Sequence, residues 1–309
     1  MVKQMGVESF DGDWLALREP FDAAARNPRL AQALMEHLDA KGRPRFLDLG
    51  AGTGSLTRWL GHFVGRAHAW VLADADPELI SRAFDTMMDS AEAIGWRATW
   101  PQRKVLLLHP PEGAWRIEGI LTNLAEAPGG LPLENVDAVT CSALCDLVSE
   151  AWLARLAAGL AQRKLPFYAA LNVSGREWFS PPFPGDALVA RGFARDQRRA
   201  KGFGGKALGA AAPDAIARAF EAHGYRVLRG GSPWIIPRQA REMAHDLAMG
   251  HAEAALRHER RGAAQIREWA ETRAEQAEWG LLSVRVEHQD VLCLPGQARS
   301  RGEASCANG

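Results

Sequence analysis

Three glycines and one aspartate form the stretch with the clearest chemical meaning in this 309-residue sequence. Asp48 lies in a short apolar segment, and Gly50, Gly52 and Gly54 follow it at alternate positions. Glycine lets the backbone turn tightly and lets a ligand approach it closely. We expect a helix to begin directly after Gly54, so its free N–H groups and its positive dipole end should face the loop. The stretch therefore predicts a small-molecule site at Asp48–Gly54.

The spacing of these residues separates two classes of cofactor. A nicotinamide-binding loop has the pattern GxGxxG and holds a pyrophosphate. Here the third glycine comes one residue early, and Ser55 stands at the later position. The carboxylate of Asp48 is an unfavourable neighbour for a pyrophosphate and a favourable one for an ammonium group. The stretch favours a cofactor that carries an amino acid, and a nicotinamide-type Rossmann oxidoreductase is the alternative.

The loop resembles motif I of the class I methyltransferases that use S-adenosylmethionine (SAM). This resemblance implies that Asp48 helps to hold the methionine amino group, directly or through water. It also implies that the loop residues pass beneath the cofactor: Gly50, Ala51, Gly52, Thr53 and Gly54.

Asp74 closes the second apolar segment, and Asp74-Ala75-Asp76-Pro77 resembles the family's motif II. The resemblance implies that Asp74 accepts hydrogen bonds from both ribose hydroxyls, with Ala75 beside it. A carboxylate has the two oxygens that this contact needs. Asp76 is the competing candidate, and Asp74 is preferred because Pro77 suits the first turn of a helix.

Two later segments complete the implied cofactor site. Asn123 and Leu124 follow a strand-like run, where family members often carry an aspartate that contacts the adenine amino group; an amide oxygen can accept the same hydrogen bond. Ser142 and Asp146 follow the next strand, where the family's loop passes the methionine part and the methyl acceptor. Ser142 is assigned to the cofactor, and Asp146 is the candidate general base.

Strands alternate with helices from residue 45 to 171, which is typical of a doubly wound parallel sheet. With the resemblance, the expected fold is α/β and Rossmann-like: a mostly parallel seven-stranded sheet with helices on both faces and added helical cap segments. We expect an N-terminal helical segment at 1–44 and a SAM-binding domain at 45–295. Within that domain, 172–212 is expected to be a loop or lid and 238–279 a helical insertion. Residues 296–309 are polar and expected to be disordered.

The methyl acceptor is expected near the fifth strand, because ligands of open α/β sheets lie beyond the carboxyl ends of the strands. Asn172 and Arg176 are therefore candidate substrate contacts. Arg198 and Lys201 are three residues apart and could share one anion on a helical turn; a solvated basic surface is the alternative. The hypothesis is methyl transfer to an oxygen or nitrogen of a small molecule, in its narrower form an anionic metabolite.

Composition limits the other classes of protein to which this chain could belong. The chain has 37 basic and 37 acidic residues, so it lacks the basic excess of a typical nucleic-acid binder. Its four cysteines have no metal-ligand spacing, and no metal is expected. The sequence shows no apolar run long enough for a membrane span and no signal peptide, so a cytoplasmic protein is expected.

Two further interpretations stay open. Residues 14–20 and 201–204 resemble an uncharacterised bacterial group of small-molecule methyltransferases, which implies no particular substrate. A catalytically inactive SAM-binding protein with a regulatory or interaction role is the second hypothesis, and 238–279 would then be its docking surface. An exposed apolar face on that segment would favour it.

Overall fold

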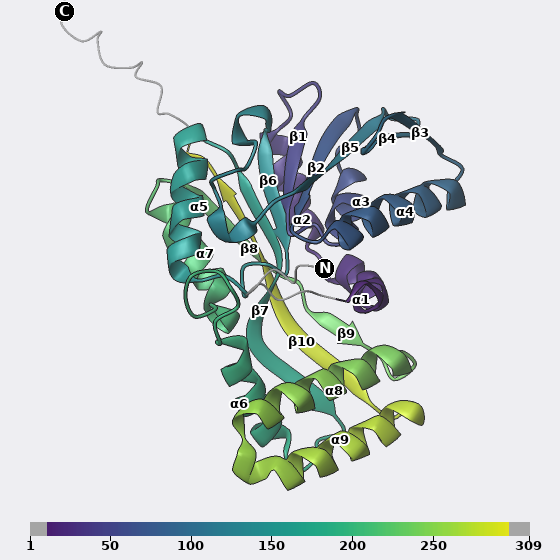
Figure 1. Ribbon diagram of the computed structural model, residues 1–309, viewed down its shortest axis with the longest axis vertical. Helices are drawn as coiled ribbons and strands as arrows, with labels where there is room; N and C mark the ends of the chain where they lie inside the picture. Colours follow the sequence, from purple (N-terminus) through teal and green to yellow (C-terminus); the bar gives the residue numbers. More distant parts are fainter. Residues whose placement is uncertain (1–10, 297–309) are drawn as a thin grey trace, which may run out of the picture.

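The structure, a computed structural model, describes residues 11–296. At its centre lies one ten-stranded sheet with the order β3-β4-β5-β2-β1-β6-β7-β10-β8, and β9 pairs with β10 (Figure 1). The strands are β1 (Arg45–Leu49), β2 (His68–Asp74), β3 (Arg97–Gln102), β4 (Val105–His109), β5 (Trp115–Leu121), β6 (Ala138–Ser142), β7 (Phe167–Ser180), β8 (Arg226–Gly231), β9 (Trp234–Ile236) and β10 (Ser283–Leu294).

Helices cover both faces of the sheet, as the sequence predicts. One hydrophobic core includes Trp152 and Phe220 from α5 and α7, and the other includes Leu34, Leu60 and Phe84 from α2, α3 and α4. The helices are α1 (Gly12–Ala25), α2 (Pro28–His37), α3 (Ser55–Gly61), α4 (Pro77–Ala93), α5 (Glu150–Arg163), α6 (Asp186–Gln197), α7 (Ala212–Glu221), α8 (Arg241–His258) and α9 (Ala263–Glu278).

The sheet is parallel at its centre and antiparallel toward both edges. Strands β5, β2, β1, β6 and β7 run parallel to one another. Strands β3 and β4 add an antiparallel edge on one side, and β10 runs antiparallel to β7, β8 and β9 on the other. The expected mostly parallel sheet of seven strands is therefore corrected to a mixed sheet of ten. Strand β3 was not expected, because its residues are largely exposed and carry little apolar pattern.

The segment 172–212 is not the long loop that the sequence predicts. Strand β7 continues to Ser180, because its second half pairs with the start of β10 across residues 283–286. Helix α6 follows and packs on α8, which in turn packs on α9. These helices and the β7–β10 extension enclose a third core around Trp269. Figure 1 shows this helical layer beyond the central sheet, with α6, α8 and α9 beside the extended strands.

The N-terminal helices are attached to the sheet through one buried carboxylate. Asp290 of β10 is fully buried and accepts hydrogen bonds from Asn27 N at 2.8 Å, Tyr168 Oη at 2.7 Å and Leu171 N at 2.8 Å. This network fixes the junction of α1 and α2 against β7 and β10.

No helix between residues 11 and 296 has the length and apolar character needed to cross a membrane. The expected tail, apart from Gly296, lies outside the described residues.

Candidate functional site

The loop between β1 and α3 takes the conformation that its glycines predict. Gly50, Gly52 and Gly54 have φ angles of 64°, 53° and 78°, in the left-handed region that disfavours side chains. The N–H of Gly50 donates to Ala73 O at 2.8 Å, and the N–H of Gly52 donates to Asp74 Oδ2 at 2.9 Å. The loop is thus held against the end of β2.

The carboxylate of Asp74 lies at the end of β2, where it is half-buried. Its Oδ1 accepts a hydrogen bond from Asp76 N at 3.0 Å, while Oδ2 accepts the one from Gly52. Each carboxylate oxygen can accept a further hydrogen bond. Burial raises the pKa of Asp74, although hydrogen bonds from the backbone oppose this effect. Asp74 is therefore placed to accept hydroxyl hydrogens from a ligand on the loop.

Asp76 has a different role from Asp74. Its Oδ1 accepts hydrogen bonds from Glu78 N at 2.8 Å and from Leu79 N at 3.4 Å, which caps the first turn of α4. Pro77 is the first residue of that helix, as the sequence predicts. Asp76 thus serves as the N-cap of α4, and the ribose contact of Asp74 stays a prediction.

Asp48 is buried beneath the loop and is only 1% exposed. Its carboxylate accepts hydrogen bonds from Thr140 Oγ1 at 3.0 Å and from Thr57 Oγ1 at 3.2 Å. Burial raises the pKa of Asp48 to about 7, although these hydroxyls oppose the shift. The carboxylate joins β1 to β6 and α3, and both of its oxygens face threonine hydroxyls.

Arg26 is a site residue that sequence analysis missed. Arg26 is 3% exposed, and its guanidinium lies between the start of α3 and the end of β6. Nη2 donates to Ser55 Oγ at 3.0 Å and to Ser142 Oγ at 3.2 Å, whereas Nε has no hydrogen-bond partner among the described residues. Asp22, four residues earlier, is an ion-pair partner of Arg26 at 3.8 Å, but Ser55 and Ser142 are 29 and 116 residues away, so the sequence does not show that Arg26 reaches them.

Helix α1 lies over the glycine loop. Leu15 Cδ1 would be 3.2 Å from a Cβ atom added at Gly52. Glu19 forms an ion pair with Arg58 of α3, and Asp13 forms one with Arg82 of α4 at 2.7 Å. The N-terminal segment therefore forms one wall of the candidate site.

The structure brings Leu124 to the loop but gives Asn123 a local role. A Cβ atom added at Gly50 would lie 3.8 Å from Leu124 Cδ1. The side chain of Asn123 accepts a hydrogen bond from Ala125 N at 3.1 Å and donates one to Glu126 Oε1 at 3.0 Å. Asn123 thus caps the 3-10 helix Leu124–Glu126, and its amide oxygen already has a donor.

The residues expected around the acceptor are dispersed. Asp146 is 8% exposed, and its backbone oxygen accepts a hydrogen bond from Gly209 N at 2.9 Å. Asn172 is fully buried within the sheet, where its Nδ2 donates to Ala169 O and Gln289 O at 2.9 Å. Arg176 is exposed on the extension of β7. Asn172 is therefore corrected from a pocket residue to a residue that joins two strands.

The proposed pairing of Arg198 with Lys201 is wrong in its geometry. Helix α6 ends at Gln197, and Arg198 is an exposed residue at its C-cap. Lys201 lies beyond the helix and is 8% exposed, so the two side chains do not share a helical turn. Arg191 and Arg195 both form ion pairs with Glu259. Arg191 and Arg195 are thus part of an ion-paired surface, and the solvated basic surface stays the alternative for Arg198.

Within residues 11–296, no group of three or more His, Cys, Asp or Glu side chains could hold a metal ion. No protein-family model and no curated protein matches the sequence.

Solved structures with a similar fold include a cyclopropane-fatty-acyl-phospholipid synthase-like protein from Lactobacillus casei. It is 15% identical, the match covers 90% of this chain and 99% of that one, and the TM-score is 0.48. A SAM-dependent methyltransferase from Geobacter sulfurreducens in complex with S-adenosylhomocysteine is 13% identical, with 94% and 100% coverage and a TM-score of 0.41. At these values the likeness carries no inference about activity.

Proposed function

We propose that this protein binds SAM on the Gly50–Gly54 loop and transfers its methyl group to a small molecule. The observation that carries the proposal is the position of Asp74, whose carboxylate lies against the loop through the 2.9 Å hydrogen bond from Gly52 N. A nucleoside on this loop would have its ribose hydroxyls beside a half-buried carboxylate. Charge-assisted hydrogen bonds of this kind are strong.

The charges around the loop favour an amino-acid-bearing cofactor. Arg26 adds a buried guanidinium next to Ser55, at the N-terminus of α3, where the helix dipole also favours an anion. A carboxylate group of a ligand at this position would contact both the Arg26 guanidinium and the N-terminus of α3. The residues that would hold SAM are thus Asp74 for the ribose, Arg26 for the methionine carboxylate, and the glycine loop beneath the ligand. When bound, SAM supplies a methyl group already activated by the positive charge of its sulfur.

The contribution of the protein to methyl transfer would be alignment and the exclusion of water. Helix α1 covers the loop on one side, and the β7–β10 extension with α6 lies beyond the carboxyl ends of the central strands. Asp146, in the segment after β6, remains our candidate for accepting a proton from an oxygen or nitrogen acceptor.

Calorimetric titration of the purified protein with SAM, S-adenosylhomocysteine and NAD⁺ tests the proposal. We expect both sulfur compounds to bind and NAD⁺ not to bind. Preferential binding of NAD⁺ would support the nicotinamide alternative, and the absence of binding to SAM and to S-adenosylhomocysteine would refute the proposed function. SAM binding without methyl transfer to any compound of a metabolite library would instead support the inactive regulatory protein.

A further inference from the structure

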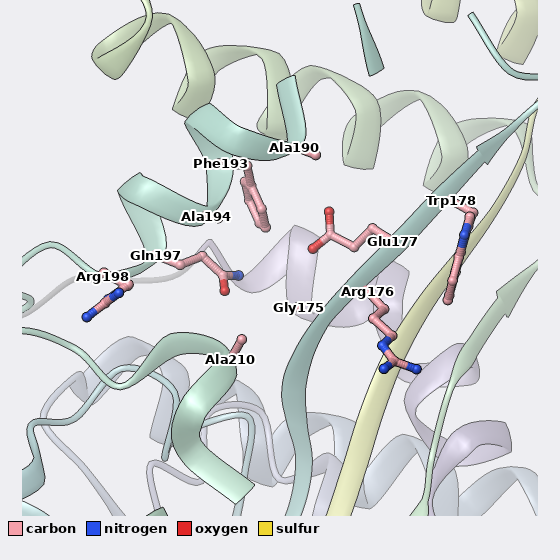
Figure 2. A pocket seen from close by; sticks show the side chains of 10 residues that line it. All are labelled: Gly175, Arg176, Glu177, Trp178, Ala190, Phe193, Ala194, Gln197, Arg198 and Ala210. Atoms are coloured by element: carbon pink, nitrogen blue, oxygen red, sulfur yellow. The ribbon is translucent and has the colours of Figure 1, made fainter. Parts of the chain in front are cut away.

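A second site is built on the extension of β7, outside the glycine loop. A cavity of about 300 Å³ lies between this extension, α6 and the 3-10 helix Gly209–Ala211. This volume is at the lower end of the range for small-molecule sites. Figure 2 shows the side chains of Glu177, Phe193 and Gln197 pointing toward one another across the cavity, with Ala210 below them.

The carboxylate of Glu177 is held from behind by a buried histidine. His251 of α8 is 3% exposed, and its Nε2 lies 2.5 Å from Glu177 Oε2. Its Nδ1 lies 2.6 Å from Leu247 O. Because a carbonyl oxygen only accepts, Nδ1 must carry a hydrogen atom. Burial lowers the pKa of His251, but the Glu177 carboxylate and the two hydrogen bonds outweigh this effect and raise it.

This arrangement leaves one oxygen of Glu177 for a ligand. Among residues 11–296, the side chain of Glu177 makes its hydrogen bond through Oε2, to His251. Oε1 is thus available in the cavity that Glu177 lines. The ring of Phe193 stacks on His251, with the ring centroids 3.9 Å apart, and forms an apolar wall beside the carboxylate.

Arg176 and Arg198 also line the cavity, but in Figure 2 their guanidinium groups point away from Glu177. Side chains alternate along a strand, so Arg176 and Trp178 lie on the face of β7 opposite to Glu177, as Figure 2 shows. In the same view Arg198 points away from Glu177. The His251 ring, whose pKa is raised, contacts Oε2, so Oε1 is left as a hydrogen-bond acceptor. Oε1 accepts a hydrogen bond from an O–H or N–H group and repels the oxygens of an anion, which have no hydrogen atom to donate.

One wall of the cavity is hydrogen-bonded to the chain that follows β6, which leads back to the candidate cofactor site. Gly209 N donates to Asp146 O at 2.9 Å and Leu208 N donates to Val148 O at 2.9 Å, so the cavity's Ala210 wall is attached to that segment. The same segment begins at Ser142, which contacts Arg26.

We propose that this cavity binds the methyl acceptor as an uncharged or cationic alcohol, phenol or amine whose O–H or N–H donates to Glu177 Oε1 and whose apolar part packs on Phe193. His251 is the positioning residue that orients the carboxylate. The assignment as acceptor site rests on the proposed methyl transfer, and it replaces the anionic acceptor that the basic residues around 198 suggest.

Ligand-observed NMR with three probes of one size, benzylamine, benzyl alcohol and benzoate, tests the proposal. We expect wild-type protein to bind benzylamine and benzyl alcohol and to reject benzoate. Glu177→Gln should weaken benzylamine binding at least fivefold and allow benzoate to bind, because the repelling charge is gone. Glu253→Gln, an exposed carboxylate of α8, is the matched control and should change nothing.

SAM affinity, measured on the same samples, separates the two proposals. Unchanged SAM binding together with the probe pattern above supports both. SAM binding with no probe binding, with a preference for benzoate, or with a Glu177→Gln variant that binds benzylamine like wild type overturns the cavity proposal alone. Loss of SAM binding in wild type removes the acceptor assignment with the proposed function. If Glu177→Gln does not fold, Ala194→Phe, at an exposed position of α6 that lines the cavity, should block the binding of benzylamine and benzyl alcohol.

Discussion

The guanidinium of Arg26 donates a hydrogen bond to the hydroxyl of Ser142 at 3.2 Å, across 116 residues of sequence. The same guanidinium contacts Ser55, the first residue of α3. One side chain of the N-terminal segment thus joins the start of the helix after the glycine loop to the end of β6. The guanidinium also lies 3.8 Å from the carboxylate of Asp22, and its buried Nε has no hydrogen-bond partner among the described residues.

Arg26→Lys should weaken SAM binding roughly tenfold or more, because a lysine cannot reproduce the forked contact of a guanidinium with a carboxylate. The control is 5′-methylthioadenosine, which lacks the amino-acid part of SAM. Its affinity should stay within twofold of wild type. An equal loss for both ligands in calorimetry would show that Arg26 acts through the fold instead.

Asp74→Asn should also lower SAM affinity roughly tenfold or more, since each lost charge-assisted hydrogen bond contributes about 1.5–3 kcal/mol before partial compensation by water. Asp76→Asn is the matched variant, because an asparagine can still cap α4. We expect calorimetry to give near-normal affinity for Asp76→Asn. The opposite ranking of the two variants would transfer the ribose contact to Asp76.

Gly52→Val should abolish detectable SAM binding while most of the fold remains. The φ angle of 53° at this position is strained for a β-branched residue, and a Cβ atom there would lie 3.2 Å from Leu15 Cδ1. Circular dichroism checks the fold of the variant, and calorimetry on the same preparation checks its SAM affinity. A native spectrum with retained SAM affinity would exclude the loop from the cofactor site.

Asp48→Asn should change how stability depends on pH. Burial raises the pKa of Asp48 to about 7 in the folded protein, whereas the ordinary value is 3.8. Between these two pH values the folded state keeps a proton on Asp48 that the unfolded state releases. The free energy of unfolding of the wild type therefore falls as pH rises through this range. The variant lacks this loss. Its stability relative to wild type should rise from pH 4 to pH 7, by an amount on the order of 4 kcal/mol at about 1.4 kcal/mol per pKa unit.

Urea unfolding of both proteins at several pH values measures this difference. A stability difference that is constant with pH would show that Asp48 is ionised throughout. Desolvation is the cause that raises the pKa of Asp48. The two threonine hydroxyls act in the opposite direction, because their hydrogen bonds favour the charged carboxylate.

The sequence by itself determined the features that depend on neighbours along the chain. Alternate glycines require a tight left-handed turn, so Gly50–Gly54 could be predicted as a loop between β1 and α3. Pro77 marks the first turn of α4, which is the local reason for preferring Asp74, at the end of the preceding strand, to Asp76. Apolar patterning predicted the alternation of strands and helices over 45–171 and the helical insertion at 238–279, where the structure has α8 and α9.

The tertiary structure decided what depends on residues far apart in the chain. The extension of β7 exists because residues 283–286 pair with it, and no local pattern in residues 172–180 predicts this pairing. Asn172 is buried for the same reason, since β10 covers it. Arg26 meets Ser142 across 116 residues, and His251 meets Glu177 across 74. Such contacts arise when separate elements pack together, so the physical reason for each site residue lies in the fold and not in its own segment.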